Sequence, residues 1–403
     1  MTDSRQFGPL ANLRILDIAT IIAAPFAGTL LADLGADVVK LELPGIGDGM
    51  RGFPPFKEGK SLWWKAANRG KQFGTLDLRK KEGADLLLKM LPQFDVLIEN
   101  FRPGTLDRWG LDKETLWKAN PKLVILRVTA FGQDGPYIDR PGFARIFEAM
   151  GGLTHITGDP DRPPVHTGYP ISDAFGGVFG AMSILAALYK VANSERTEGE
   201  EIDLALTEAT FRLLDFLAIE YDQLGDVRER SGNKNQYSAP SDVYLTSDKK
   251  YVSLAGSTNT TFLANATAVG RPELAKDPRF ENNALRVKNG QELDRIFGEF
   301  ISTHTLDEVL DAFNTAGGTI APIYSIEQIF NDPQYQAREA ITTVPDDDFG
   351  SVRLQNVVPK MTRNPGKVRW TSKELGQDSD AVFEKYLGLS KEEIEDCRSR
   401  GII

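Results

Sequence analysis

The chain has 403 residues, of which 47 are lysine or arginine and 57 are aspartate or glutamate, so its formal net charge is −10. At roughly 100–200 residues per domain, this length predicts two or three domains, each large enough to bury a core. A hydrophobic fraction of 41% excludes a disordered or fibrous chain. The acidic balance, with no long basic run, argues against nucleic acid or an anionic membrane surface as the main partner.

The single cysteine, Cys397, permits neither an intramolecular disulfide nor a cysteine-rich metal site, which favours a reducing compartment. The first residues lack the charged-then-apolar pattern of a signal peptide. The longest uncharged segment, Ala174–Tyr189, has 16 residues, fewer than the roughly 20 that a bilayer requires. We therefore expect a cytoplasmic protein without a membrane span, in which this segment is a buried helix.

The first half of the chain alternates between strand and helix patterns. An apolar, β-branched run at Leu13–Ala19 is followed by a helical pattern at 25–34 and by the strand-like DVVKLE at Asp37–Glu42, which together predict a βαβ unit. Further strands are expected at 74–78, 95–99 and 122–129, with helices at 80–91 and 113–119. The alternation predicts a doubly wound parallel sheet. No G-x-G-x-x-G follows the first strand, which argues against a dinucleotide site.

The region from Gly142 to Asp173 is rich in glycine, proline and polar residues, which predicts a long ordered loop of the kind that often carries function. Two long helices are expected after it, at 174–191 and 206–224, with a strand at EEIDLAL between them. The composition changes near Gly225. Two short strands and three helical patterns then indicate a second, smaller α+β domain at 226–330.

Several common catalytic arrangements are missing from the sequence. No G-x-S-x-G nucleophile elbow is present, and Cys397 stands among acidic residues, so a hydrolase triad is not expected. Neither H-x-x-x-H nor D-x-D-x-D-G occurs, so we expect no metal site. His155 and His166 lie in the loop, where a local hydrogen-bonding role and a catalytic role both stay open, whereas His304 reads as a helix-start residue.

Asp173 closes the loop and precedes the long apolar helix, so it has two interpretations. It is either an N-cap that accepts backbone N–H bonds, or a functional carboxylate that the positive end of the helix keeps ionised. The glycines that follow it, Gly176 and Gly177, permit a bulky ligand to approach. Such a carboxylate is able to attack a thioester.

Arginines follow two of the predicted strands. Arg79 comes just after the strand at 74–78, and Arg102 and Arg108 follow the strand at 95–99, with Phe101 beside them. The carboxyl ends of parallel strands are where α/β sheets bind ligands. Arginines with a neighbouring aromatic ring suit a phosphorylated nucleotide, although ordinary surface arginines would show the same pattern.

Several longer segments carry a resemblance to a known family. They read LANLRILDIATIIAAPFAGTLLADLGADVVKLE, ENFRPGTLDRWGL, NPKLVILRVTAFGQDGPYIDRPGF, EAMGGLTHITGDPDRPP and PISDAFGG, followed late in the chain by DPQYQAREAITTV and VVPKMTRNPG. In this order they resemble the class III CoA-transferase family over nearly the whole chain. The carnitine CoA-transferase branch is the most similar.

The resemblance implies a large Rossmann-like, CoA-binding domain built from both chain ends, 1–225 and 331–403, with the small domain 226–330 inserted. It also implies an interlocked homodimer, or a heterodimer with a paralogue. Asp173 matches the family's nucleophile, and Arg102 and Arg108 are the implied phosphate partners. The implied contacts to coenzyme A are Ile22, Ala23, Leu76, Arg79, Asn100, Phe101, Arg102, Arg108 and Phe143.

The implied activity is transfer of CoA from a donor such as succinyl-CoA to a small carboxylic acid, through an aspartyl anhydride and an aspartyl-CoA thioester. Gly176, Gly177 or the loop at 231–235 is expected to stabilise the oxyanions. Two alternatives stay open. A 2-methylacyl-CoA racemase of this fold carries a catalytic histidine where Phe143 stands. A non-catalytic acyl-CoA-binding subunit would fit the departures at Ala144 and Glu148, where relatives usually carry a polar residue and glutamine.

Overall fold

The computed structural model describes residues 7–193 and 198–403. The chain divides into two compact units. The first unit combines Met1–Leu153, Thr167–Ile219 and Gln336–Ile403, and the second combines Thr154–His166 and Glu220–Tyr335. The first unit therefore contains both ends of the chain. Residues 154–166, which lie within the loop that the sequence analysis placed in the large domain, belong to the second unit.

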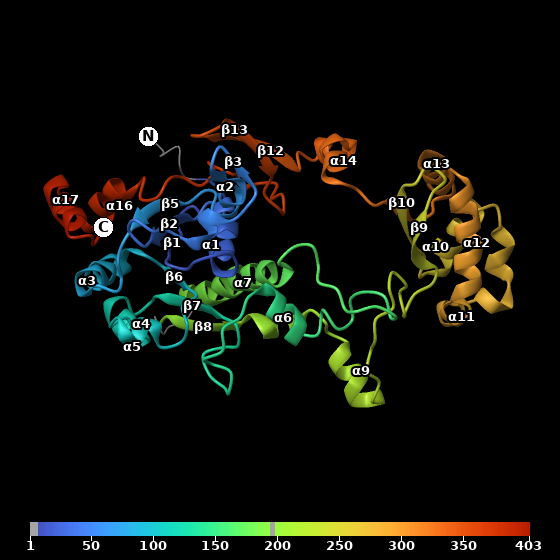
Figure 1. Cartoon of the computed structure of the whole chain (residues 1–403), viewed down its shortest axis with the longest axis horizontal. Helices are drawn as coiled ribbons and strands as arrows, with labels where there is room; N and C mark the ends of the chain where they lie inside the picture. The colour runs from blue at the N-terminus through green and yellow to red at the C-terminus, as the bar shows by residue number, and fades with distance from the viewer. Residues whose placement is uncertain (1–6, 194–197) are drawn as a thin grey trace. The chain divides into compact units, whose positions relative to one another are not determined.

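The first unit is built on a six-stranded parallel sheet with the order β5-β2-β1-β6-β7-β8 (Figure 1). Its strands are β1 (Arg14–Asp17), β2 (Asp37–Glu42), β5 (Gln72–Thr75), β6 (Val96–Glu99), β7 (Val124–Thr129) and β8 (Glu200–Ala205). The predicted α/β fold is confirmed. The chain adds strands on one side of β1 and then returns to its other side with β6, so the β1–β6 boundary is the topological switch point where such sheets bind ligands.

Both faces of the sheet are apolar. Successive side chains of a strand point to opposite sides, and in β1, β2 and β6 neighbouring residues are both apolar. Ile15, Val38 and Val96 pack on one side against α1 (Ala23–Asp33) and α7 (Ile171–Asn193). Their neighbours Leu16, Val39 and Leu97 pack on the other side, with helices from both halves of the chain. These helices are α3 (Lys81–Met90), α4 (Thr105–Arg108), α5 (Lys113–Ala119), α16 (Ser379–Leu387) and α17 (Lys391–Ser399).

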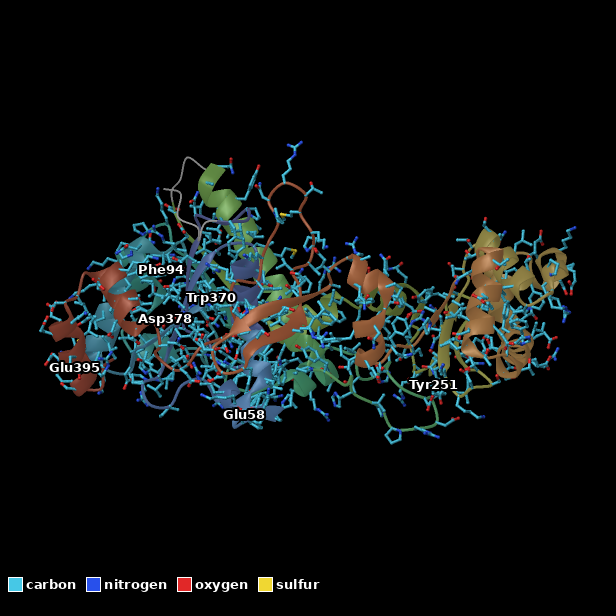
Figure 2. The ribbon with its side chains drawn as sticks, turned by 90° about the horizontal axis from the view of Figure 1, so that it is seen from above. Glu58, Phe94, Tyr251, Trp370, Asp378 and Glu395 are labelled. Carbon is cyan, nitrogen blue, oxygen red and sulfur yellow. The ribbon has the colours of Figure 1, made fainter. Side chains whose placement is uncertain are left out.

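The C-terminal segment is fastened to the edge strand β5. Trp370 donates its indole N–H to Lys71 O at 2.7 Å, and the carboxylate of Asp378 accepts from Phe73 N at 2.9 Å (Figure 2). The helix α16 that follows lies beside α3 (Figure 1). The remaining elements of this unit are β3 (Phe56–Lys57), β4 (Lys60–Ser61), α2 (Leu62–Ala67), α6 (Ala144–Met150), α8 (Leu206–Arg212), β12 (Ile341–Asp346) and β13 (Gly350–Gln355).

Helix α7 packs along α1 through a row of glycines. A Cβ atom at Gly177 would lie 2.6 Å from Phe26 Cδ1, and one at Gly180 would lie 3.2 Å from Ala27 Cβ. Only glycine therefore permits this close approach. The helix begins at Ile171 and ends at Asn193, so it is longer than the uncharged run. By length and composition alone it is apolar enough to cross a membrane, and its packing on α1 and the sheet accounts for this composition.

The second unit contains a three-stranded antiparallel sheet of order β11-β10-β9, formed by Ile320–Pro322, Tyr251–Ala255 and Ser241–Leu245. Its core joins Val252 and Leu254 of β10 to Phe262, Phe297 and Phe313 from three helices. The helices are α10 (Asn259–Ala268), α11 (Asn283–Lys288), α12 (Gly290–Thr303), α13 (Leu306–Ala316), α14 (Ile326–Asn331) and α15 (Pro333–Ala337, extending into the first unit).

Two predictions of local structure are wrong. The loop expected from Gly142 to Asp173 contains α6, which forms because Ala144, Phe147 and Glu148 present a buried face to α7 and α8. The single helix expected at 206–224 is broken into α8 and α9 (Leu217–Leu224). The apolar pattern continues across the break with no glycine or proline, but the buried residues of α8 end at Thr210 and α9 buries none.

Candidate functional site

A first pocket lies at the carboxyl ends of β1, β2 and β5. It contains three of the expected CoA contacts, Leu76, Arg79 and Phe101, and the ring of Trp109 meets Phe101 edge to face at 5.0 Å. The other lining residues come from the end of β2 and from the turns after the same strands: Ile18, Ala19, Thr20, Leu41, Glu42, Leu43, Gly47, Asp48, Asp77 and Leu78. Arg79 is only partly available to a phosphate, because its guanidinium pairs with Asp77 at 2.8 Å.

A second pocket follows β6 and β7 and shares Phe101 with the first. Asn100, Arg102 and Phe143, which the resemblance assigns to CoA, all line it. Arg140 lines it as well, stacked 3.7 Å from the ring centroid of Tyr137. Arg140 was not among the predicted contacts, although its place just before the P-G-F segment was an available signal.

Three other expected contacts lie apart from these two pockets. Arg108 is exposed on α4 and donates to Thr105 Oγ1 at 2.9 Å, so a direct phosphate contact has less support for Arg108 than for Arg102. Ile22 and Ala23 are 7% and 6% exposed at the start of α1. Ala23 packs against α7, and Ile22 packs against Met50, Trp64 and Phe73, so neither lines either pocket.

Asp173 is the third residue of α7, which begins at Ile171 directly after Pro170. The N-cap interpretation is therefore wrong, because Asp173 lies inside the first turn. Its neighbour Ser172 accepts a hydrogen bond from Thr210 at 2.8 Å, which ties this turn to α8. Asp173 itself is 9% exposed and has no hydrogen-bond or ion-pair partner among the described residues 7–193 and 198–403.

The environment of Asp173 changes its acidity. Burial raises the pKa of Asp173 to about 7, and the negative charge of Glu148 adds to the shift. Glu148 is 1% exposed on α6, a helix that packs directly on α7. A buried carboxylate with a like charge nearby gains free energy by binding a proton or by reacting with an electrophile. This is the setting expected of a nucleophile rather than of a structural carboxylate.

The packing of α1 on α7 places the start of α1 beside Asp173. Ala23 O would lie 3.1 Å from a Cβ atom at Gly177, and Ala27 is adjacent to Gly180, so the two helices run in the same direction with matched turns. Asp173, Gly177 and Gly180 share one face of α7, because they are spaced by three and four residues. The first turn of α1 therefore lies level with Gly176 and Gly177, about one turn beyond Asp173, and its N–H groups point back along the helix axis toward the level of Asp173.

This register changes the expected source of oxyanion donors. Gly176 and Gly177 are the sixth and seventh residues of α7, so their N–H groups belong to the helix ladder and are not free. At the start of α1, by contrast, the N–H groups of Ile22, Ala23 and Ala24 have no acceptor within the described parts of the chain. The third candidate, the loop Ser231–Asn235, lies in the second unit.

The loop histidines also lie in the second unit. His155 Nε2 stands 3.4 Å from a carboxylate oxygen of Glu229, and His166 Nδ1 is 3.3 Å from Thr154 Oγ1. Within residues 7–193 and 198–403, no cluster of three or more histidine, cysteine, aspartate or glutamate side chains has a metal-binding arrangement.

Comparison with known proteins matches this geometry to a family. A family model described as CoA-transferase family III matches residues 10–379. The chain belongs to CoA-transferase family III. The expected family is thereby confirmed. Sequence identity to named CoA-transferases over nearly the whole chain identifies the chain as a CoA-transferase. Its place in the carnitine branch stays a prediction.

The relatives in this family include two proteins from Chloroflexus aurantiacus that match over nearly their whole length. The succinyl-CoA–D-citramalate CoA-transferase is 39% identical over 404 residues, which cover 100% of both chains. The β subunit of succinyl-CoA–L-malate CoA-transferase is 39% identical over 399 residues, 98% of each chain. The crystal structure of a CaiB/BaiF family protein from Brucella suis superposes with a TM-score of 0.83 at 33% identity, covering 94% of this chain and 100% of that one.

Proposed function

We propose that this chain transfers CoA from succinyl-CoA to a small dicarboxylic acid, with Asp173 as the covalent nucleophile. The observation that carries the proposal is the state of Asp173, a buried carboxylate without a partner at the ligand-binding edge of a parallel sheet. The names of the Chloroflexus relatives, which pair succinyl-CoA with a hydroxylated dicarboxylic acid, support this choice of donor and acceptor.

In the proposed reaction, a carboxylate oxygen of Asp173 attacks the thioester carbonyl of the donor. The C–S bond breaks, leaving an acyl-aspartyl anhydride and the CoA thiolate. The thiolate then attacks the aspartyl carbonyl and releases the donor acid as a carboxylate. The acceptor carboxylate attacks the resulting aspartyl-CoA thioester, and the returning thiolate cleaves the second anhydride to give the new acyl-CoA and free Asp173.

Each of these additions places negative charge on a carbonyl oxygen. The unpaired N–H groups of Ile22, Ala23 and Ala24 lie at the start of α1, about one turn beyond Asp173. The positive end of that helix faces the level of Asp173, where it favours such charge. We assign them the oxyanion role in place of Gly176 and Gly177. Arg145, exposed on α6 and without an ion-pair partner among the described residues, is the candidate for the distal carboxylate of the acceptor.

The function is tested by incubating the purified chain with succinyl-CoA and a panel of dicarboxylic, aryl-substituted and carnitine-like acids. Formation of a new acyl-CoA with release of succinate is the expected result. Hydroxylamine or borohydride added during turnover should leave a mass change on the peptide that contains Asp173. Transfer without any modification at Asp173 would exclude the covalent scheme.

Two alternative functions are separated by the same preparation. A non-catalytic subunit would be inactive alone and active only after a paralogue is added, a possibility raised by the relative named as a β subunit. A racemase would exchange the α-proton of a 2-methylacyl-CoA with solvent deuterium. Phe143 opposes this alternative, because its phenyl ring cannot accept a proton and lies 72% exposed at the start of α6.

A homodimer is part of this proposal, and its expected interface lies on α7. Val178, Met182, Leu185 and Tyr189 form an exposed apolar stripe at helical spacing. We expect Met182→Glu to convert the dimer to a monomer of 44.5 kDa in light scattering, since a buried carboxylate would be unpaired. Tyr251→Glu, at a residue of the second unit with the same 55% exposure, is the control and should remain dimeric. A wild-type monomer would refute the proposed dimer.

The pH dependence of the reaction follows from the raised pKa of Asp173. Since only the ionised carboxylate attacks, kcat/KM for acyl-CoA should rise with pH and level off above about 7. Glu148→Gln removes the neighbouring negative charge, lowers the pKa of Asp173 and moves this rise to lower pH. Glu208→Gln, an exposed change on α8, should leave the profile in place. Identical profiles for all three proteins would contradict the coupling.

The second pocket predicts which arginines bind the phosphates of CoA. Replacing Arg102 or Arg140 by alanine should raise KM for acyl-CoA roughly tenfold, as expected for a lost charge-assisted hydrogen bond, with little change in kcat. Steady-state kinetics with the donor varied measures this effect. Arg108→Ala should raise KM less than Arg102→Ala does. Arg295→Ala, at an exposed position of α12 in the second unit, should leave KM unchanged. A larger effect at Arg108 than at Arg102 would reverse the assignment.

A further inference from the structure

The turn between β1 and α1 contains an unusual backbone conformation. Ile21 has φ = +69°, in the left-handed region. A β-branched residue is rarely found there, because its Cβ substituents crowd the neighbouring carbonyl. Such a conformation persists only where surrounding groups enforce it, and it occurs most often at functional sites. The groups that enforce it can be identified here.

Three side chains from outside the turn hold its backbone. The carboxylate of Asp48 accepts from Ile21 N at 2.9 and 3.2 Å. Asn100, at the end of β6, binds Thr20 at both its N–H and its carbonyl, at 2.8 and 2.7 Å. Lys40 Nζ donates to Ala19 O at 2.5 Å. Every residue from 19 to 21 is thus tied to a different strand or loop.

Asp48 is itself fixed within a buried group of charges. Its carboxylate lies 3.1 Å from Lys40 Nζ, Lys40 lies 3.9 Å from Asp17, and Lys71 lies 2.8 Å from Asp17, with all four side chains 0% exposed. We call Asp17, Lys40, Asp48 and Lys71 the charge quartet. A second contact orients the backbone of Asp48, whose N–H donates to Glu42 at 2.9 Å.

The enforced turn leads directly into the first turn of α1. Ile21 precedes Ile22, Ala23 and Ala24, whose unpaired N–H groups lie about one turn beyond Asp173 and point back toward its level. With Thr20 N and Ile21 N already bound to Asn100 and Asp48, the direction of the chain entering α1 is set before the helix begins. A change of φ at Ile21 would redirect the peptide groups that follow it.

We propose that Asp48 is a positioning residue for the transfer reaction: by holding Ile21 in the left-handed conformation, it aims the N–H groups of the first turn of α1 at the acyl group bound beside Asp173. This inference rests on the proposed function of Asp173. It assigns no contact between Asp48 and the substrate, because the carboxylate accepts hydrogen bonds from Ile21 N and Met50 N and forms an ion pair with Lys40.

The test uses glycine, which adopts positive φ without steric cost, against alanine, which does not. Asp48→Asn should lower kcat/KM for acyl-CoA about tenfold or more, mainly through kcat. The double variant with Asp48→Asn and Ile21→Gly should have a kcat/KM several-fold higher than Asp48→Asn alone. The double variant with Ile21→Ala should have a kcat/KM no higher than Asp48→Asn alone. Packing alone would favour the opposite order, since alanine keeps the Cβ atom that glycine lacks.

Controls separate folding from positioning. Asp112→Asn, which alters the N-cap of α5, should keep wild-type kinetics. If Asp48→Asn does not fold, Ile21→Gly and Ile21→Ala with Asp48 intact carry the test, and glycine should retain the higher kcat/KM. Wild-type kinetics for Asp48→Asn, or equal rates for the glycine and alanine variants, would overturn the proposal.

Failure of the proposed function has a different signature. If the wild type transfers no CoA to any acid, the same variants are compared by hydrogen exchange of the peptide spanning 18–24. Faster exchange in Asp48→Asn, with the wild-type level recovered by Ile21→Gly but not by Ile21→Ala, would support the role of Asp48 in the turn. Unchanged exchange would overturn it.

Discussion

Replacing Asp173 by asparagine or alanine is expected to reduce CoA transfer by about 10³-fold or more, because the substitution removes the carboxylate that forms the anhydride. The amide of asparagine has nearly the same shape, so the loss would reflect chemistry rather than packing. Initial rates with both acids supplied measure the effect. Turnover at the wild-type rate in Asp173→Ala would refute the covalent scheme.

The same substitution should stabilise the fold, which distinguishes a nucleophile from a structural carboxylate. Folding raises the pKa of Asp173 to about 7 from the ordinary 3.8, so the folded state binds the proton more tightly. Stability from this group is therefore present at low pH and is lost as pH rises through about 7. Asp173→Asn removes this pH-dependent loss of stability. The Tm of the variant should therefore exceed the wild-type Tm, by a difference that grows between about pH 4 and 7 and stays constant at higher pH. A lower Tm at pH 8 would indicate a structural role.

The second large effect is expected from Asp17, which stands between Lys40 and Lys71 in the charge quartet. Burial works to raise the pKa of Asp17, but the two ammonium groups outweigh it and lower the pKa. Asp17→Asn would leave two buried ammonium groups with Asp48 as the remaining carboxylate of the quartet. Loss of one member of a buried ion pair costs about 3–5 kcal/mol of unfolding free energy. Urea denaturation, followed by circular dichroism, measures this loss.

A matched control uses an exposed ion pair on the same unit. Asp85 pairs with Lys81 on α3, where the side chains are 47% and 84% exposed. Asp85→Asn should cost about 0.5 kcal/mol or less, since solvent screens the pair. If Asp17→Asn costs no more than Asp85→Asn, the charge quartet does not contribute to stability.

Most strands of the large sheet could be predicted from sequence because they are short runs rich in apolar and β-branched residues, and the strand DVVKLE at Asp37–Glu42 has the predicted bounds. The helix KETLWKA at Lys113–Ala119 also has the predicted bounds. The strand β12 was missed, because ITTVPD contains a proline and polar residues at the edge of a two-stranded sheet. Its last residue, Asp346, is buried against Lys65 at 3.0 Å rather than solvated, a pairing across 281 positions that no local pattern reveals.

The candidate site was predicted unevenly. Asp173 and Arg102 stand in segments whose spacing and resemblance point to a ligand. Arg140 offered only its place before the P-G-F segment as a signal. Asp48 offered none, since it acquires its place through its hydrogen bond to Ile21 in the turn after β1. The unpaired N–H groups of α1 are a property of the backbone, so side-chain identity alone does not show them.

By itself, the sequence determined an acidic α/β chain, its parallel sheet and its family, because these depend on local periodicity and on segments that are contiguous. Only the tertiary structure decided that Asp173 is buried without a partner, that α1 begins beside it and that Asp48 holds the intervening turn. The physical reason is that a raised pKa, a matched helix register and an enforced φ arise from groups far apart in the chain. They become neighbours only when the sheet forms.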